Sequence, residues 1–184
     1  MRNLLSILYV LFASAIVAHA TCVFAQTTSG QTDGQISSDA AIGRAVTGVI
    51  SYTRWPAPLS SVRLCVVGEV HDWRSGTTAT SLPSDPPISV RPMAVSDEGL
   101  PTTCDALYLG ALSEGDRRLL YQRIADHPFL TITEQDRSCT SGAMFCIDAS
   151  DTRVRFDVNI DSVSRSGVHV SPKVLELARK LNTP

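Results

Sequence analysis

The stretch VRLCVVG, Val62 to Gly68, is an almost uninterrupted apolar run. Two further runs share this character: CDALYLGAL, Cys104 to Leu112, and more weakly AMFCI, Ala143 to Ile147. A strand that is covered on both faces has apolar side chains at nearly every position, and such strands are typical of the interior of an α/β sheet. The three runs therefore predict parallel strands that are buried on both sides.

The segments around these runs predict further elements of an α/β fold. ISVRPMAV, residues 88–95, and FLTIT, residues 129–133, are plausible strands. Before FLTIT, Ser113 and Asp116 form a capping-box pattern at the start of an apolar stripe, and the His-Pro pair at 127–128 ends the stripe. This segment is expected to be a helix.

Each end of the domain carries an amphipathic helical pattern. From Ser38, apolar residues recur at helical spacing until Trp55-Pro56, because the residue before a proline avoids the helical conformation. Near the C-terminus, Ser171 and Pro172 are typical first residues of a second such helix. The apolar positions are Ile42, Val46, Val49 and Ile50 in the first pattern and Val174, Leu177, Ala178 and Leu181 in the second.

The last third of the chain changes character. RVRFDV, residues 153–158, alternates apolar and charged residues after a polar turn, which predicts an antiparallel hairpin with one exposed face. NIDSVSRSG follows as a short helix that stops at Gly167. Together the elements predict one α/β domain over residues 37–184, with a mixed, mostly parallel sheet of about six strands flanked by helices on both faces.

The N-terminus, MRNLLSILYVLFASAIVAHATCVFAQ, is typical of a secretory signal peptide. Arg2 precedes an apolar run from Leu4 to Ala18 that is too short to cross a bilayer. We expect residues 1–25 to be removed, including Cys22, although Ala20 offers an alternative cleavage position. The protein is therefore expected to be exported through the inner membrane.

The remainder of the chain has no strong electrostatic signature. Residues 26–36, which follow the expected cleavage position, are small and polar and predict a disordered tail. The formal net charge is −2 at pH 7, and no run of basic residues stands out. The composition therefore gives no sign of binding to nucleic acid or to anionic lipid.

Four of the five cysteines lie outside the expected signal peptide: Cys65, Cys104, Cys139 and Cys146. An even number in an exported chain favours disulfides, while the spacing lacks the short pairs of a zinc site and the C-x-x-C of a thiol oxidoreductase. Of the three connectivities, the simplest joins Cys65 to Cys104 and Cys139 to Cys146, because it links elements that are expected to be neighbours. The short loop closed by the second bond could be reducible and serve as a redox sensor.

The chain contains none of the common catalytic motifs for serine hydrolases, nucleotide binding or zinc proteases. His71, His127 and His169 remain after signal removal, each in a setting typical of a loop or surface. A hydrolase would be favoured if His127 or His169 lay beside a carboxylate in a crevice. We expect no enzymatic activity and no cofactor.

Aromatic residues support two different binding hypotheses. Trp55, Tyr108 and Phe129 could line a pocket for a small molecule at the strand ends. Tyr52, Arg54 and Trp55 are residue types that are enriched at protein-binding hot spots, although Trp55 could equally cover the core after the first helix.

Phe145 lies in the weakest of the three apolar runs. In a strand, its side chain and those of Met144 and Cys146 point to opposite faces of the sheet. If only one face is inside, the other could form a contact surface.

Four stretches resemble the YfiR family of periplasmic proteins. They are SYTRWP at 51–56, RLCVVG at 63–68, SCTSGAMFC at 138–146 and the tail VRFDVNIDSVSRSGVHVSPKVLELARK at 154–180. The tail is the most specific of them, and the likeness extends from about Val46 to Lys180. Residues 69–99 match no motif of the family.

The resemblance implies a non-catalytic regulator in the periplasm. Members of the family repress an inner-membrane diguanylate cyclase by binding its periplasmic sensor domain, and an outer-membrane OmpA-like lipoprotein relieves the repression by sequestering them. The output is cytoplasmic cyclic di-GMP, and hence biofilm and exopolysaccharide. Homodimers are usual in the family.

The resemblance also implies which residues matter in this sequence. It supports the same two disulfides, Cys65 with Cys104 and Cys139 with Cys146. A hydrophobic patch near the second disulfide would place Phe145 and Val163 at a partner contact, with Arg54 on a neighbouring surface.

Overall fold

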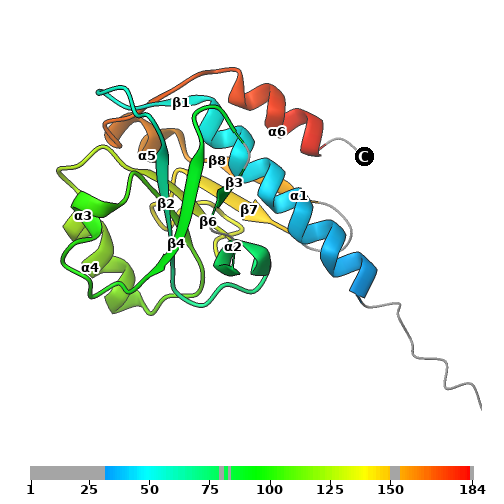
Figure 1. Cartoon of the computed structure of the whole chain (residues 1–184), viewed down its shortest axis with the longest axis horizontal. Coiled ribbons are helices and arrows are strands. Elements are labelled where there is room, and N and C mark those ends of the chain that lie inside the picture. Colours follow the sequence, from blue (N-terminus) through cyan, green and yellow to red (C-terminus); the bar gives the residue numbers. More distant parts are fainter. Residues whose placement is uncertain (1–31, 79–80, 83, 150–153, 183–184) are drawn as a thin grey trace, which may run out of the picture.

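The computed structural model describes residues 32–78, 81–82, 84–149 and 154–182 (Figure 1). The expected signal peptide, residues 1–25, lies outside this part of the chain. None of the helices described is both long and apolar enough to span a membrane. In chain order the elements are α1 (Thr32–Ser51), β1 (Thr53–Arg54), β2 (Val62–Val67), α2 (Arg74–Thr78), β3 (Ser81–Leu82), β4 (Ile88–Met93), α3 (Leu100–Thr103), β5 (Ala106–Leu109), α4 (Glu114–Ile124), β6 (Leu130–Thr133), β7 (Phe145–Asp148), β8 (Arg155–Val158), α5 (Ile160–Arg165), β9 (His169–Val170) and α6 (Val174–Asn182).

The main sheet has seven strands in the order β3-β4-β2-β5-β6-β7-β8. Strands β4, β2, β5, β6 and β7 run parallel, while β3 and β8 pair antiparallel at the two edges. The prediction of a mixed, mostly parallel sheet is confirmed. The additional strand is β3, whose two residues are too few to produce a sequence pattern. A separate two-stranded sheet pairs β1 with β9 and sets Arg54 opposite His169.

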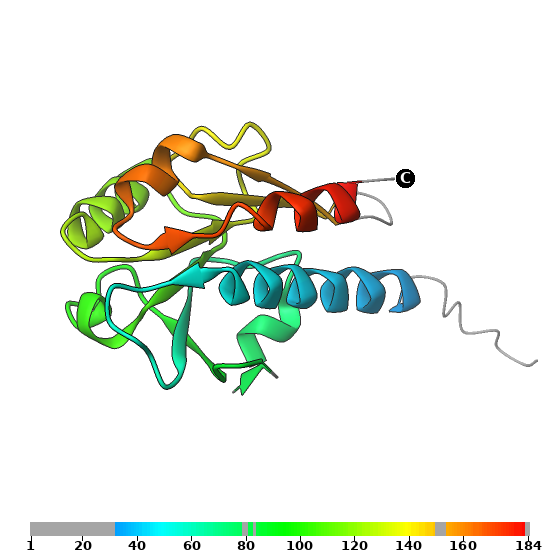
Figure 2. The ribbon, with the colours of Figure 1, turned by 90° about the horizontal axis from the view of Figure 1, so that it is seen from above.

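Helices cover both faces of the sheet, as predicted. Along β2, Leu64 and Val66 join a core cluster that includes residues of α1 and α6, whereas Cys65 and Val67 join a second cluster with residues of α3 and α4. The last four positions of the strand therefore face a helical layer on one side or the other, which explains the apolar run. Figure 2 shows α1 and α6 lying side by side along the first face.

Helix α1 begins at Thr32, before the start at Ser38 that the apolar pattern predicts. The expected disordered tail, residues 26–36, thus overlaps the first turns of this helix, and the rest of that segment lies outside the described residues. Adding residues to a helix that packing already holds requires no new nucleation, so a helix can extend beyond its apolar stripe. The lack of apolar residues before Ser38 therefore does not predict the first residue of the helix.

Several local predictions are confirmed. The Ser113 hydroxyl accepts a hydrogen bond from the Asp116 backbone N–H at 3.0 Å, so it caps α4 as expected. Gly167 has a φ of 75°, the left-handed conformation predicted at the end of α5. β7 and β8 form the predicted antiparallel hairpin. Helix α6 starts at Val174 rather than at Pro172, after a turn.

Both expected disulfides are present. Cys65 in β2 is bonded to Cys104, the residue that follows α3, with their Cα atoms 5.8 Å apart. Cys139, in the loop before β7, is bonded to Cys146 in β7, with a Cα separation of 5.5 Å. The pairing that adjacency of the elements favours is the one that the structure has.

Candidate functional site

The carboxyl and amino ends of the parallel strands are two possible places for a binding site. In doubly wound α/β sheets, ligands bind outside the carboxyl ends of the strands, at the point where the strand order reverses. Here the chain passes from β2 to β4 on one side of β2 and then to β5 on its other side. The reversal therefore lies between β2 and β5.

Backbone contacts close the space at this point. Just beyond the two strands, the Ala111 N–H donates to the Glu69 carbonyl at 2.7 Å, and the Glu69 N–H donates to the Ala111 carbonyl at 3.2 Å. A Cβ atom at Gly110 would lie 2.2 Å from the Glu69 carbonyl oxygen. Glycine alone permits this approach, so main chain fills the position where a ligand crevice is usual.

A buried carboxylate holds the same end together. Glu134 directly follows β6, and its side chain has no exposed surface. It accepts hydrogen bonds from the backbone N–H groups of His71, Asp72 and Trp73 at 2.5, 3.2 and 3.3 Å, and from the Tyr108 hydroxyl at 2.9 Å. These donors offset the cost of removing a carboxylate from water. Burial, and then the charge of Glu134, raises the pKa of Tyr108.

The geometry that would favour a hydrolase is present only in part: among the described residues, His127 lines a pocket together with Asp105, but no ion pair joins His127 or His169 to a carboxylate. His127 and His169 are exposed, and the histidine ion pairs found among the described residues belong to His71. The His71 Nε2 atom lies 3.6 Å from Glu69, and its Nδ1 atom lies 4.0 Å from Glu134. Because Glu134 already accepts four hydrogen bonds, its carboxylate is occupied by structural contacts.

A pocket of about 350 Å³ lies near the amino ends of the strands, between α4 and α5. Thr131 of β6 and Met144, which directly precedes β7, complete its wall. Its lining is mainly apolar and aromatic and includes one guanidinium group; the main side chains are Tyr121, Ile124, Phe129, Met144 and Arg165. The size and lining fit a small organic molecule or a side chain of a partner.

A second pocket, of about 260 Å³, shares His127 and Phe129 with the first. Trp55 forms part of its wall, so the structure brings together two of the three residues predicted to line a small-molecule site. Tyr108 does not join them, and that part of the prediction is wrong. It is fully buried, and its ring packs edge-on against Trp73 with the ring centres 4.8 Å apart.

Helix α5 is tied to the second disulfide through Asn159. The Asn159 side-chain oxygen accepts a hydrogen bond from the Ser162 N–H at 2.9 Å and so caps the helix. Its Nδ2 atom donates to the Cys139 carbonyl at 2.8 Å, and its backbone N–H donates to the Met144 carbonyl at 2.9 Å. One residue thus connects the disulfide loop, the entrance of β7 and the first turn of α5.

Asp136 organises the loop that carries Cys139. Its carboxylate accepts hydrogen bonds from the Ser141 N–H at 2.6 Å and from the Ser138 hydroxyl at 2.8 Å. Burial alone would raise the pKa of Asp136, but the hydrogen bonds outweigh it and lower the pKa to about 2. The loop is therefore held by a charged acceptor next to the disulfide.

The structure separates the three residues expected to contact a partner. Phe145 is 0% exposed and packs edge-to-face against Phe156, with the ring centres 6.0 Å apart. The prediction that Phe145 lies on a contact surface is therefore wrong, because β7 is covered on both faces as β5 and β6 are. Val163 on α5 is half-buried, and Arg54 is exposed with its guanidinium donating to two nearby backbone carbonyls.

Ile160 is an exposed apolar residue that the sequence analysis missed. It is the first residue of α5 and is 63% exposed, compared with 40% for Leu119 and 41% for Leu175. Ile160 and Val163 are spaced i, i+3 and so lie on the same side of the helix. That spacing is visible in the sequence, but it does not show that the first of the two residues stays outside the core.

Sequence comparison relates this arrangement to a known family. A family model described as YfiR/HmsC-like matches residues 42–179. The matched region begins in α1 and ends in α6, so it includes both disulfides, the two pockets and Ile160.

Proposed function

The chain belongs to the YfiR/HmsC-like family, and from this we propose that it is a periplasmic repressor of an inner-membrane diguanylate cyclase. Membership supports a regulator of diguanylate cyclase rather than an enzyme. In this proposal the protein binds the periplasmic sensor domain of the cyclase and keeps the enzyme inactive. Cyclic di-GMP then stays low, and so do biofilm and exopolysaccharide.

Two further partners belong to the proposal. An outer-membrane OmpA-like lipoprotein would relieve repression by sequestering the protein, and the protein would act as a homodimer. Both partners are expected from the family, and the lipoprotein would be the means by which repression is relieved.

The observation that best supports docking is the exposed apolar side chain of Ile160 on a helix of fixed position. Ile160 and Val163, which is three residues further along α5 and half-buried against the core, are here called the α5 surface. Exposed apolar groups on a rigid element are suited to bury against a partner. Arg54 lies at the same end of the molecule, because β1 pairs with β9, which follows α5 (Figures 1 and 2).

Repression requires that the protein bind the inactive sensor more tightly than the active one, since a ligand shifts an equilibrium only through its differential affinity. Reduction of Cys139–Cys146 would free the loop whose carbonyl holds Asn159. We propose that α5 then loses its fixed orientation and that affinity for the inactive sensor falls. This link makes the repressor responsive to reducing conditions.

The binding test uses the mature protein as bait on detergent-solubilised membranes. The wild type is expected to retain a multi-span protein with a cyclase domain, and Ile160→Asp is expected to retain at least about tenfold less, because a charge cannot be buried in an apolar contact without cost. Leu119→Asp is the matched control, since it places the same charge on an exposed leucine of α4. Absence of a cyclase in the wild-type sample would contradict the function, and equal retention by Ile160→Asp would contradict the α5 surface.

A cellular test addresses the output. Deletion of the gene in a strain that still makes the cyclase should raise cyclic di-GMP, and re-expression of the wild type or Leu119→Asp should lower it again. Ile160→Asp should fail to do so at equal periplasmic abundance. Unchanged cyclic di-GMP on deletion would count against the whole proposal.

The pocket between α4 and α5 supports a second candidate, binding of a small periplasmic metabolite. Its volume of about 350 Å³, its mainly apolar lining and the single guanidinium of Arg165 fit a small ligand with an apolar body and a negative group. Calorimetry against small aromatic and aliphatic carboxylates would detect such a ligand. Binding that Arg165→Gln does not weaken would contradict this site.

A further inference from the structure

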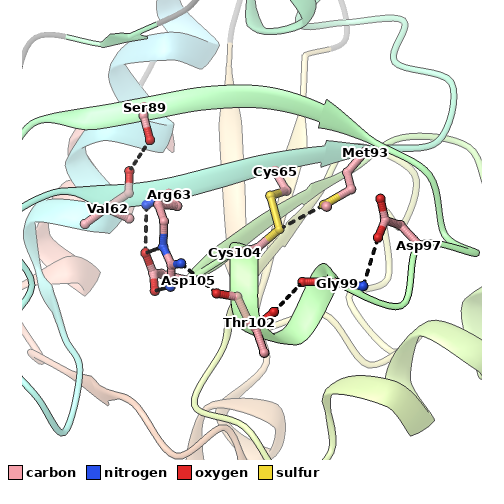
Figure 3. Close-up of a disulfide and its surroundings, with 10 residues drawn as sticks. All are labelled: Val62, Arg63, Cys65, Ser89, Met93, Asp97, Gly99, Thr102, Cys104 and Asp105. Carbon is pink, nitrogen blue, oxygen red and sulfur yellow. Dashed lines mark hydrogen bonds and ion pairs between the residues drawn. A yellow bond between two sulfur atoms is a disulfide. The ribbon is translucent and has the colours of Figure 1, made fainter.

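The first disulfide has a neighbour that the functions above do not use. The Sδ atom of Met93, the last residue of β4, lies 3.3 Å from the Sγ atom of Cys104 (Figure 3). A disulfide sulfur carries no hydrogen, so this is a direct nonbonded contact between the two sulfur atoms. The thioether therefore packs on the disulfide itself.

Burial places Met93 on the outside of this contact. Cys65 is 0% and Cys104 is 3% exposed, whereas Met93 is only half-buried. Along β4, Ile88 and Val90 belong to the core cluster of α1, and Met93 belongs to the other face, with the disulfide and α3. The Met93 side chain is thus the half-buried group on one side of a nearly buried disulfide, whose Cys104 borders the second pocket on another side.

The other methionines of the chain differ from Met93 in position. The sequence has three: Met1 lies in the expected signal peptide, and Met144 is 1% exposed. Oxidation of methionine follows exposure of the thioether. Met93 is therefore the more exposed of these two methionines, and Met144, which is 1% exposed although it borders the pocket between α4 and α5, serves as the internal comparison.

We propose that Met93 is an oxidant-sensitive site that controls access of reductants to the Cys65–Cys104 disulfide. The oxidants are two-electron oxygen donors of the hypohalous acid or peroxide class. With hypochlorous acid, the Met93 sulfur gives up two electrons and gains one oxygen to form the sulfoxide, while the chlorine takes up the two electrons and leaves as chloride with release of a proton. The site acts independently of the partner proposed above.

The sulfoxide would remove the cover from the disulfide. Its oxygen is a strong hydrogen-bond acceptor, and it would have to enter a cluster of apolar side chains that includes Leu100 and Leu107. The group gains more by turning to water, which takes the Met93 side chain away from Cys104. A dithiol reductant can then attack the Cys104 sulfur: the reductant closes to its own disulfide, and Cys65 and Cys104 take up two electrons and two protons.

An ion pair next to the disulfide is expected to hold the fold together when the disulfide is reduced. Arg63, two residues before Cys65, and Asp105, the residue after Cys104, form a bidentate ion pair, with Nη2 to Oδ1 at 2.7 Å and Nε to Oδ2 at 2.8 Å (Figure 3). The Arg63 backbone N–H also donates to Asp105 Oδ2 at 2.8 Å. β2 and the start of β5 thus remain joined, and a change in disulfide reactivity is not a sign of general unfolding.

The test treats the mature, disulfide-bonded protein with less than one equivalent of hypochlorous acid and then measures reduction by dithiothreitol. Alkylation and peptide mass spectrometry report the oxygen gained at Met93 and Met144 and the free thiol at each cysteine. Oxidised protein should show faster release of Cys65 and Cys104 thiols, by about fivefold or more, while release at Cys139 and Cys146 stays unchanged. Methionine sulfoxide reductase should restore the slow rate.

Two variants make the result decisive. Met93→Leu keeps an apolar cover that cannot be oxidised, so hypochlorous acid should leave its reduction rate unchanged; Met93→Gln carries a permanent polar group and should be fast without oxidant. Circular dichroism of each sample confirms that the fold persists. Oxidation of Met144 as readily as Met93, an unchanged rate after Met93 oxidation, or the same acceleration in Met93→Leu would each overturn the proposal.

Discussion

The carboxyl and amino ends of the parallel strands have opposite properties in this protein. At the carboxyl end, Gly110 lets the main chain close between β2 and β5, and Glu134 fastens the segment from His71 to Trp73 with its buried carboxylate. At the amino end, α4 and α5 leave a pocket of about 350 Å³, and Ile160 is exposed. The usual ligand crevice between β2 and β5 is closed here. The carboxyl end keeps a polar pocket of about 330 Å³ lined by Asp72, Glu134 and Arg137, whereas the apolar surfaces suited to recognition lie at the opposite end.

This difference predicts separable effects of mutation. Substitutions at the carboxyl end should reduce the free energy of unfolding and leave the α5 surface unchanged in the molecules that remain folded. Substitutions at the amino end should cost less stability and act on partner binding or on the second disulfide. The predictions below follow this order, from the largest expected effect to the smallest.

Glu134→Ala should have the largest effect. The substitution leaves three backbone N–H groups and the Tyr108 hydroxyl without their acceptor in a buried place, which should cost about 3 to 5 kcal/mol. Urea unfolding followed by circular dichroism measures the loss. Glu69→Ala is the matched control, because the Glu69 side chain is 80% exposed and its removal should cost less than about 0.5 kcal/mol. Equal costs for the two variants would show that Glu134 does not hold the carboxyl end.

Gly110→Ala should also destabilise the carboxyl end, by about 2 to 3 kcal/mol. The new Cβ would lie 2.2 Å from the Glu69 carbonyl oxygen, and this neighbour is backbone that cannot move without opening the contact with Ala111. Gly115→Ala is the control: the nearest atom to its Cβ would be the Ser113 hydroxyl at 3.8 Å, and alanine should stabilise α4 by about 0.5 to 1 kcal/mol. The two alanines are thus expected to shift the urea midpoint in opposite directions, and a neutral Gly110→Ala would mean that the strands can separate there.

The sheet could be predicted from the sequence because a strand that is buried on both faces is apolar at nearly every position. Runs such as VRLCVVG and the Ser113 cap depend on neighbours within a few residues, and both are confirmed. The same apolar pattern argues against an exposed Phe145, since AMFCI, the run that contains it, is apolar at every position like the buried runs. The error came from treating β7 as a strand with one covered face.

The contacts that close the carboxyl ends of β2 and β5 could not be predicted from a local sequence pattern. Glu134 bonds to the His71 N–H across a sequence separation of 63 residues, and backbone donors carry no information in the side-chain sequence. For the same reason residues 69–99, which match no motif, still supply the donors that fix Glu134. The exposure of Ile160 also depends on what packs around α5, which periodicity in a six-residue helix does not report.

At the amino end, Asn159→Ala should cost about 1 to 2 kcal/mol, because α5 loses the cap on Ser162 and the tie to the Cys139 carbonyl. Asn159→Asp separates the two contributions: it keeps an oxygen that accepts from Ser162 but has no N–H to donate to Cys139. We expect Asp to restore most of the stability, while reduction of Cys139–Cys146 by dithiothreitol remains faster than in the wild type. If Asp also restores the slow reduction, the side-chain tie does not couple α5 to the disulfide.

The smallest expected effect concerns the loop that carries Cys139. The pKa of Asp136 is lowered from 3.8 to about 2 in the folded protein, since its hydrogen bonds with Ser141 and Ser138 outweigh burial. A depressed folded pKa stabilises the folded state above the unfolded value, and this contribution is lost as the pH falls from about 4 to about 2. Because the carboxylate is partly exposed, the contribution should be about 1 kcal/mol.

Asp136→Asn should therefore be less stable than the wild type at about pH 6. The two should differ much less at about pH 2, where the wild-type carboxyl is about half protonated in the folded state and most of its contribution is lost. Asp161→Asn, at an exposed residue of α5 paired with Arg165, is the control and should follow the wild type at both values. The difference between wild type and Asp136→Asn in urea unfolding measures the effect directly. A difference that persists undiminished at the lower pH would mean that the Asp136 charge contributes nothing and that the loop beside the second disulfide is held by neutral contacts alone.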